Sequence, residues 1–187
     1  MDIEPVQRAV AAAMRGGDTV PEQRSAETAA DGPQSAVERE ALKLALQAPV
    51  LAGPMFDALA AENYRHPVHA SVREAIAEAG GAATAASGAV WIERVRDACD
   101  DLAGKALVGE LAVEPLRIAG EPDPRYVSVT LARLQLGAVT GRIRDLKSRV
   151  QRVNPVTNKD GYLALAGELF SLEQHARALR EQAVGGL

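Results

Sequence analysis

Histidine is the side chain of this sequence best suited to metal or acid–base chemistry, and its placement argues against a metal site. The three histidines are His66, His69 and His175. Metal sites in helical bundles place a glutamate three residues before a histidine, but those positions hold Asn63, His66 and Leu172. His66 and His69 have ligand-like spacing. Because His66 precedes a proline that can begin a helix, we expect a helix-capping residue with an exposed side chain.

The other residues that could do chemistry lack the partners that they would need. The three glycine pairs occur without the strand, lysine and hydroxyl of a phosphate-binding loop. The single cysteine, Cys99, excludes an internal disulfide and a cysteine-based zinc site within the chain. We therefore expect a non-enzymatic protein without metal or cofactor.

The composition predicts helices throughout. Hydrophobic residues make up 47% of the chain, much of it alanine, while aromatic residues make up only 3%, which leaves little to build a deep ligand cavity. No segment alternates apolar and polar residues over the length of a strand, so we expect an all-α protein. An acidic, polar start after Met1 and the lack of a run of about 18 apolar residues predict no membrane contact and a cytoplasmic location.

Three regions follow along the chain. Residues 1–34 contain a possible short helix at 2–15 and then a polar stretch, and we expect a flexible linker. Residues 35–136 should form a small bundle of short helices, the first capped by Ser35 and the fourth carrying Leu102. Its expected core consists of Leu44, Phe56, Val72, Ile76, Trp91 and Leu111.

The last region should be a helical hairpin subdomain at residues 137–187, following a long helix of about 29 residues that starts after Asp123. Apolar residues recur at alternating spacings of three and four on both arms. They are Val129, Ala132, Leu136, Val139, Ile143, Leu146, Val150 and Val153, and then Tyr162, Leu165, Leu169, Leu172, Ala176, Leu179 and Ala183. Asn154 and Pro155 should end the first arm, so that the two pair antiparallel. Gly137 and Gly141 are expected bend points.

Charge is distributed unevenly along the chain. Residues 1–120 hold 11 basic and 18 acidic side chains, whereas residues 121–187 hold 10 and 7. The acidic first part argues against general nucleic-acid binding. Only the basic stretch Arg142–Arg152 is a candidate, and it lacks interleaved aromatics, so direct nucleic-acid contact is the weaker interpretation.

Two aromatic residues receive opposite interpretations. Trp91 shares a helix face with Val95 and Ala98, so a core role is favoured over a ligand platform. Phe170 lies beside the seam residue Leu169 but off the stripe, which suits contact with a partner protein.

Several segments, taken in order and spacing, resemble the C-terminal region of bacterial DnaG-type primases of the actinobacterial kind. They are Leu42–Pro49, Phe56–Leu59, His66–Val68, Leu146–Pro155 and Gly167–Glu173. In that family this region is a helicase-binding domain, a helical bundle followed by a hairpin, while zinc-binding and catalytic domains lie upstream. The resemblance implies a non-catalytic fragment of a DNA primase that recruits primer synthesis to the replicative DnaB-type helicase.

The resemblance also implies two sets of contact residues. Expected helicase contacts on the hairpin are Arg149, Arg152, Tyr162, Phe170, Glu173, Arg177 and Arg180. Arg39 and Lys43, one turn apart on the first helix, are the expected clamp for the acidic tail of single-stranded DNA-binding protein. Glu38 and Glu40 flank Arg39, which departs from the basic pattern of the family. The alternative function is a helical scaffold or regulator that self-associates through its hairpin.

Overall fold

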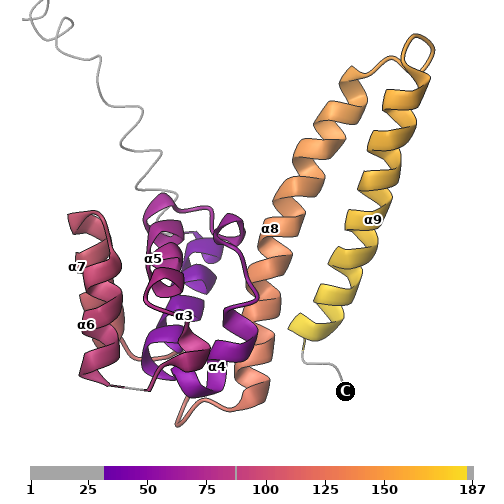
Figure 1. The fold of residues 1–187 in the computed structure, drawn as a ribbon. Coiled ribbons are helices and arrows are strands. Elements are labelled where there is room, and N and C mark those ends of the chain that lie inside the picture. Colours follow the sequence, from indigo (N-terminus) through magenta and orange to yellow (C-terminus); the bar gives the residue numbers. More distant parts are fainter. Residues whose placement is uncertain (1–31, 87, 185–187) are drawn as a thin grey trace, which may run out of the picture. The chain divides into compact units, whose positions relative to one another are not determined.

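The computed structural model describes residues 32–86 and 88–184, and every regular element in these ranges is helical (Figure 1). The elements are α3 (Pro33–Gln47), α4 (Pro49–Phe56), η1 (Ala61–Asn63), α5 (Pro67–Glu78), η2 (Ala82–Thr84), α6 (Ala89–Ala98), α7 (Leu102–Val113), α8 (Pro124–Arg152) and α9 (Lys159–Ala183). The all-α prediction is confirmed. The expected helix at 2–15 and nearly all of the expected linker lie outside the described residues.

Helix α3 is the most buried helix of the bundle. It begins at Pro33, so Ser35 lies within its first turn and does not cap it, which corrects the expected start. Its buried residues include Leu42, Leu44 and Leu46, which pack against helices on several sides. Proline is tolerated at the first position of a helix, because the N–H that it lacks would have no partner there. Pro49 accordingly begins α4 directly after the end of α3.

The expected bundle core is confirmed, since all six residues predicted for it are buried in one cluster with Leu131 and Leu134 of α8. Trp91 also donates a hydrogen bond from Nε1 to the carbonyl oxygen of Ala45 at 3.1 Å. That bond satisfies the indole inside the core and ties α6 to α3. The core interpretation of Trp91 is therefore confirmed.

The junction between α6 and α7 differs from the expectation. Leu102 was expected on the apolar face of the fourth helix but begins α7 and is 85% exposed. The reason is the cap: the side chain of Asp101 accepts a hydrogen bond from the backbone N–H of Gly104, which starts a new helix at this point.

Helix α8 is continuous from Pro124 to Arg152 and carries two buried surfaces. Its first turns pack on the bundle through Val127, Leu131 and Leu134. A second cluster joins α8 to α9 and contains Ala132, Val139, Ile143, Ala176, Leu179 and Ala183. The expected subdomain boundary at residues 136/137 thus falls inside one helix.

Helix α9 runs antiparallel to α8. Arg133 near the start of α8 donates to the carbonyl of Ala183 at the end of α9, and Lys147 pairs with Glu173 further along both helices. Figure 1 shows α9 beside α8 along this stretch. The connection is fixed by asparagines: Asn154 accepts from the N–H of Val156, and Asn158 caps α9 by accepting from that of Gly161.

None of the helices in the described ranges combines the length and apolar character that a bilayer crossing requires.

Candidate functional site

Helix α9 presents a second face beside the seam that packs on α8. Residues seven apart on a helix lie within about 20° of each other, so Leu163, Phe170 and Arg177 share one line along α9. Ala166, Glu173 and Arg180 form the adjacent line. Tyr162, a seam residue seven positions before Leu169, lies where this line borders the seam. We call this surface the lateral face of α9, defined by Tyr162, Leu163, Ala166, Phe170, Glu173, Arg177 and Arg180.

Two large apolar side chains are exposed on the lateral face. Phe170 is 64% exposed and Leu163, two helical turns earlier, is 55% exposed. Leu169 and Leu172, next to Phe170 in sequence, pack instead against the α8–α9 cluster. Phe170 is therefore not needed to hold the helix pair together, and a partner surface could bury it. The expected exposure of Phe170 is confirmed.

Charged residues border the apolar pair. Glu173 forms an ion pair with Lys147 at 2.8 Å across the two helices, and Arg177 lies 3.8 Å from Glu181 on α9. All four side chains are about half exposed or more, so each pair adds little stability. They surround Phe170 with charges of both signs, the arrangement of an interface rim around an apolar centre.

The structure does not place the two predicted arginines of α8 on this face. Lys147 is the α8 residue that reaches Glu173. Arg149 lies about 200° and Arg152 about 140° around the helix from Lys147, so both project to other sides. Arg152 instead donates to the carbonyl of Ser148 within α8. Five of the seven expected helicase contacts thus lie together, and Arg149 and Arg152 lie apart from them.

Leu163 is a residue that the sequence interpretation missed. Its signal was its position seven residues before Phe170, outside the seam. The alternating spacing of three and four selects the nearby seam residues Tyr162 and Leu165 and passes over Leu163.

Arg39 and Lys43 are both engaged by carboxylates of this chain. Arg39 donates to Glu110 at 2.6 Å and also to Glu114. Lys43 is 1% exposed, pairs with Glu40 at 2.7 Å and Glu114 at 3.2 Å, and donates to the carbonyl of Pro115. The two residues share one network, but Lys43 lies beneath it. Of the two residues expected to form the clamp, Arg39 is accessible from solvent and Lys43 is buried.

The network favours the ionised form of two of its carboxylates, those of Glu40 and Glu114. Burial alone would raise the pKa of Glu114, but hydrogen bonds from Arg39 and Lys43 outweigh it and lower that pKa. The pKa of Glu40 is lowered in the same way, against burial, by Lys43 and by the hydroxyl of Tyr126. The result is an ion-pair cluster that joins α3 to the end of α7 and to the start of α8.

The histidine pair belongs to a different buried contact. The carboxylate of Glu38 accepts from the backbone N–H groups of Arg65 and His66 and lies 2.8 Å from Nδ1 of His69. His66 takes the N-cap position of α5 by its backbone, but its side chain makes no capping bond and is half-buried, so its expected exposure is wrong. Within the described residues no group of three or more His, Cys, Asp or Glu side chains could hold a metal ion.

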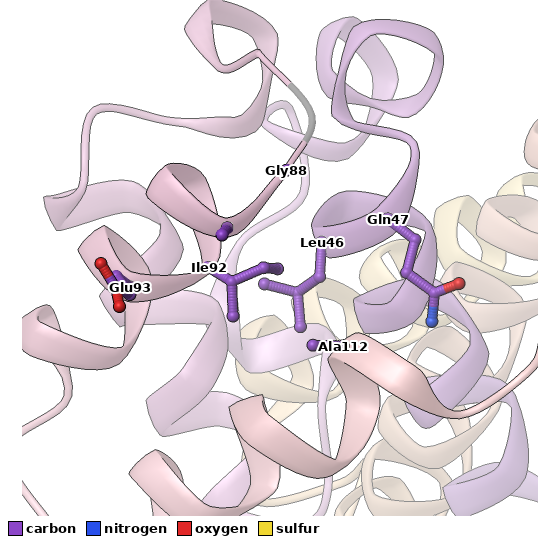
Figure 2. Close-up of a pocket in the computed structure, with 7 residues that line it drawn as sticks. Leu46, Gln47, Gly88, Ile92, Glu93 and Ala112 are labelled. Carbon is purple, nitrogen blue, oxygen red and sulfur yellow. The ribbon is translucent and has the colours of Figure 1, made fainter.

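An apolar groove on the bundle is a concave surface that could bind a partner (Figure 2). It has a volume of about 520 Å³ and is lined by Leu46, Gln47, Gly88, Ala89, Ile92, Glu93 and Ala112. Figure 2 shows Leu46 of α3 and Ile92 of α6 directed toward one another. The amide of Gln47 is held at one edge by the carbonyls of Leu111 and Glu114. With Glu93 as its single ionisable residue, the groove offers no acid–base pair for catalysis.

The described residues form a helical fold in which a paired helix exposes Phe170 and Leu163, and these features are typical of a protein-interaction module. Residues 38–165 match the family described as DNA primase DnaG DnaB-binding. The chain belongs to this family, and the expected family is confirmed.

The relatives agree with that assignment. The chain is 45% identical over 148 residues to a DNA primase of Mycobacterium tuberculosis and 38% identical over 159 residues to one of Streptomyces coelicolor, covering 79% and 83% of its own length. It spans only about a quarter of those relatives, 23% and 25%. A solved structure, the helicase binding domain of primase from Mycobacterium tuberculosis, matches with a TM-score of 0.62 and 45% identity over 80% of this chain and 93% of that one.

Proposed function

We propose that this chain is the non-catalytic part of a DNA primase that docks on the replicative DnaB-type helicase and so brings primer synthesis to the replication fork. Membership of the DnaB-binding family and the likeness to a helicase binding domain support the partner. The parent protein would be a DNA-directed RNA polymerase acting in the cytoplasm, with its catalytic part upstream of this segment.

The lateral face of α9 is the proposed contact. The observation that carries this proposal is the exposure of Phe170 and Leu163 on the same line of α9. The neighbouring seam residues Leu169, Leu172 and Leu179 pack instead in the α8–α9 cluster. An aromatic anchor surrounded by charged residues is the usual centre of a protein–protein interface. The helicase N-terminal domains would bury this strip, while Glu173 and Arg177 would fix its orientation through polar contacts at the rim.

The apolar anchors should provide most of the affinity. Burying a phenylalanine or leucine side chain contributes roughly 1.5 to 3 kcal/mol each, and the rim charges act in solvent, where ion pairs contribute about 1 kcal/mol or less. Arg149 and Arg152, which project elsewhere, would contribute mainly to long-range attraction. Their removal should therefore slow association without changing the contact itself.

The test is the dissociation constant of the chain on the purified hexameric helicase, measured by biolayer interferometry. Phe170→Ser should weaken binding at least tenfold, and Phe170→Ser with Leu163→Ser should weaken it further. Leu102→Ser is the matched control, because Leu102 is even more exposed than Phe170 and Leu163 but lies on α7. Equal affinity of wild type and double variant would refute the contact. Self-association lost in the same variant would favour the scaffold interpretation.

A second proposal concerns the acidic tail of single-stranded DNA-binding protein. The observation in its favour is that Arg39, 23% exposed, already accommodates two carboxylates at the surface, those of Glu110 and Glu114. We propose that a tail carboxylate takes the place of Glu114 on Arg39. Lys43 would support the site from beneath by holding Glu40 and the carbonyl of Pro115.

A further inference from the structure

A small cleft lies between α8, the start of α3 and the segment that leads into α5. Its volume is about 280 Å³, and its lining residues are Gln34, Arg65, Arg133, Leu136, Gly137 and Thr140. The cleft is separate from the lateral face of α9 and from the apolar groove of the bundle, because none of its residues belongs to either surface.

Two glycines of α8 create the room for the polar walls of this cleft. A Cβ at Gly137 would overlap the side chain of Gln34, and a Cβ at Gly141 would overlap the guanidinium of Arg65. Arg65 lies across this gap and donates from Nη2 to the carbonyl of Gly137 at 3.1 Å. The glycines therefore let a guanidinium and an amide lie against the backbone of α8, which explains their presence in the middle of a long helix.

No carboxylate of the described residues forms an ion pair with either arginine of the cleft. Arg65 binds the carbonyl of Gly137, and Arg133 donates from Nε to the carbonyl of Ala183 at 3.3 Å. Each of these carbonyl bonds uses one of five N–H donors, so both guanidinium groups keep donors for an anion.

The buried carboxylate of Glu38 is bound to groups other than the two guanidiniums. Glu38 accepts from the backbone N–H of Arg65, and its second oxygen faces His66 and His69. Beside the cleft, Nε2 of Gln34 is buried, and it has no hydrogen-bond partner among the described residues. The cleft thus holds two cations that have no carboxylate partner among the described residues.

We propose that this cleft binds a phosphate group. Guanidinium groups bind phosphate oxygens through two parallel N–H donors, and a doubly charged phosphate would neutralise both arginines at once, whereas a single carboxylate would leave one positive charge. The phosphate could belong to a free phosphate compound or to a nucleic-acid backbone. This proposal does not depend on helicase docking.

The test is a titration of the whole 187-residue chain with inorganic phosphate in a low-salt, phosphate-free buffer, followed by nuclear magnetic resonance. Saturable shifts should appear at the Nε–Hε signals of Arg65 and Arg133 and at the backbone amide of Thr140. Arg133→Gln should weaken phosphate binding at least tenfold. Thr140→Leu should weaken it similarly, because it fills the cleft without changing its charge.

Arg144→Gln is the matched control, since Arg144 is an exposed arginine of α8 outside the cleft. It should leave the titration unchanged, and equal weakening by Arg144→Gln and Arg133→Gln would overturn the site. Absence of saturable shifts would also overturn it.

A second arm uses a ten-residue thymidine oligonucleotide. Oligonucleotide binding at least tenfold tighter than phosphate, and lost in Arg133→Gln, would identify a nucleic-acid backbone. Equal affinities would identify a free phosphate.

Discussion

Oε2 of Glu38 lies 2.8 Å from Nδ1 of His69, and both side chains are almost fully buried between α3 and α5. Burial alone would raise the pKa of Glu38, but the hydrogen bonds from His69 and from the backbone N–H groups of Arg65 and His66 outweigh it and lower that pKa. Since an ionised carboxylate only accepts hydrogen bonds, Nδ1 of His69 carries the proton that is shared between them.

Glu38→Gln should destabilise the bundle and remove part of its dependence on acid. The folded-state pKa of Glu38 lies below the ordinary value of 4.5, so its contribution is complete above about pH 4.5 and is lost as the pH falls through the lowered value. At neutral pH the variant should lose about 1.5 to 3 kcal/mol, the scale for a hydrogen bond to a charged group. Urea unfolding at pH 7 and pH 3.5 measures both effects. If wild type and variant lost the same free energy of unfolding between pH 7 and pH 3.5, the account would be contradicted.

Trp91→Phe should cost about 1 to 3 kcal/mol, because the carbonyl of Ala45 would lose its buried donor. Thermal unfolding followed by circular dichroism measures the cost, since the variant removes the single tryptophan. Val90→Ala is the control. Val90 is next to Trp91 in sequence but its side chain is exposed, so this substitution should change stability by about 0.5 kcal/mol or less. Equal stability of wild type and Trp91→Phe would show that the hydrogen bond contributes nothing.

Leu179→Ala should loosen α9 without unfolding the bundle. Leu179 is buried in the α8–α9 cluster, whose α9 seam contains small residues such as Ala176 and Ala183, and removing a buried leucine costs about 2 to 5 kcal/mol. Hydrogen exchange should accelerate in α9 while Val72 and Ile76 of α5 keep their protection. Leu163→Ala makes the same change on the exposed face and should leave exchange unaltered. Uniform acceleration through both regions would show that they unfold as one unit.

Glu114→Gln should strengthen binding of an acidic peptide if a tail carboxylate replaces Glu114 on Arg39. We expect at least a threefold gain in calorimetry with the peptide, and Arg39→Glu should abolish binding. Arg117→Glu is the charge-matched control, because Arg117 is exposed and lies 4.0 Å from Glu40 rather than in contact with Glu114. Weaker binding by Glu114→Gln would disprove the exchange.

The helices could be predicted because their signals are local. Apolar spacing, Pro67 at the start of α5 and the glycines after it predict a helix without knowledge of the rest of the chain. Phe170 could be identified for the same reason, because the spacing within one helix is enough to show that it lies outside the apolar stripe. Leu102 shows the limit: it continues the spacing of α6, but the local cap formed by Asp101 decides where it lies.

Contacts between distant segments could not be predicted. Lys43 and Glu114 are 71 residues apart, as are Arg39 and Glu110, so nothing in their local sequence shows that the basic pair is already engaged. The cleft of Arg65 and Arg133 depends in the same way on Gly137, whose interpretation as a bend point considered only its own helix. Its function in this fold is to admit the side chain of Gln34.

The most direct test of helicase docking through α9 is a photo-crosslink from position 170. The chain would carry p-benzoylphenylalanine in place of Phe170, with a second form carrying it in place of Leu102, and each would be irradiated with the hexameric helicase. The account predicts an efficient crosslink to the helicase N-terminal domain from position 170 and none from position 102. Crosslinking from position 102 but not from position 170 would contradict it and would place the contact on the bundle.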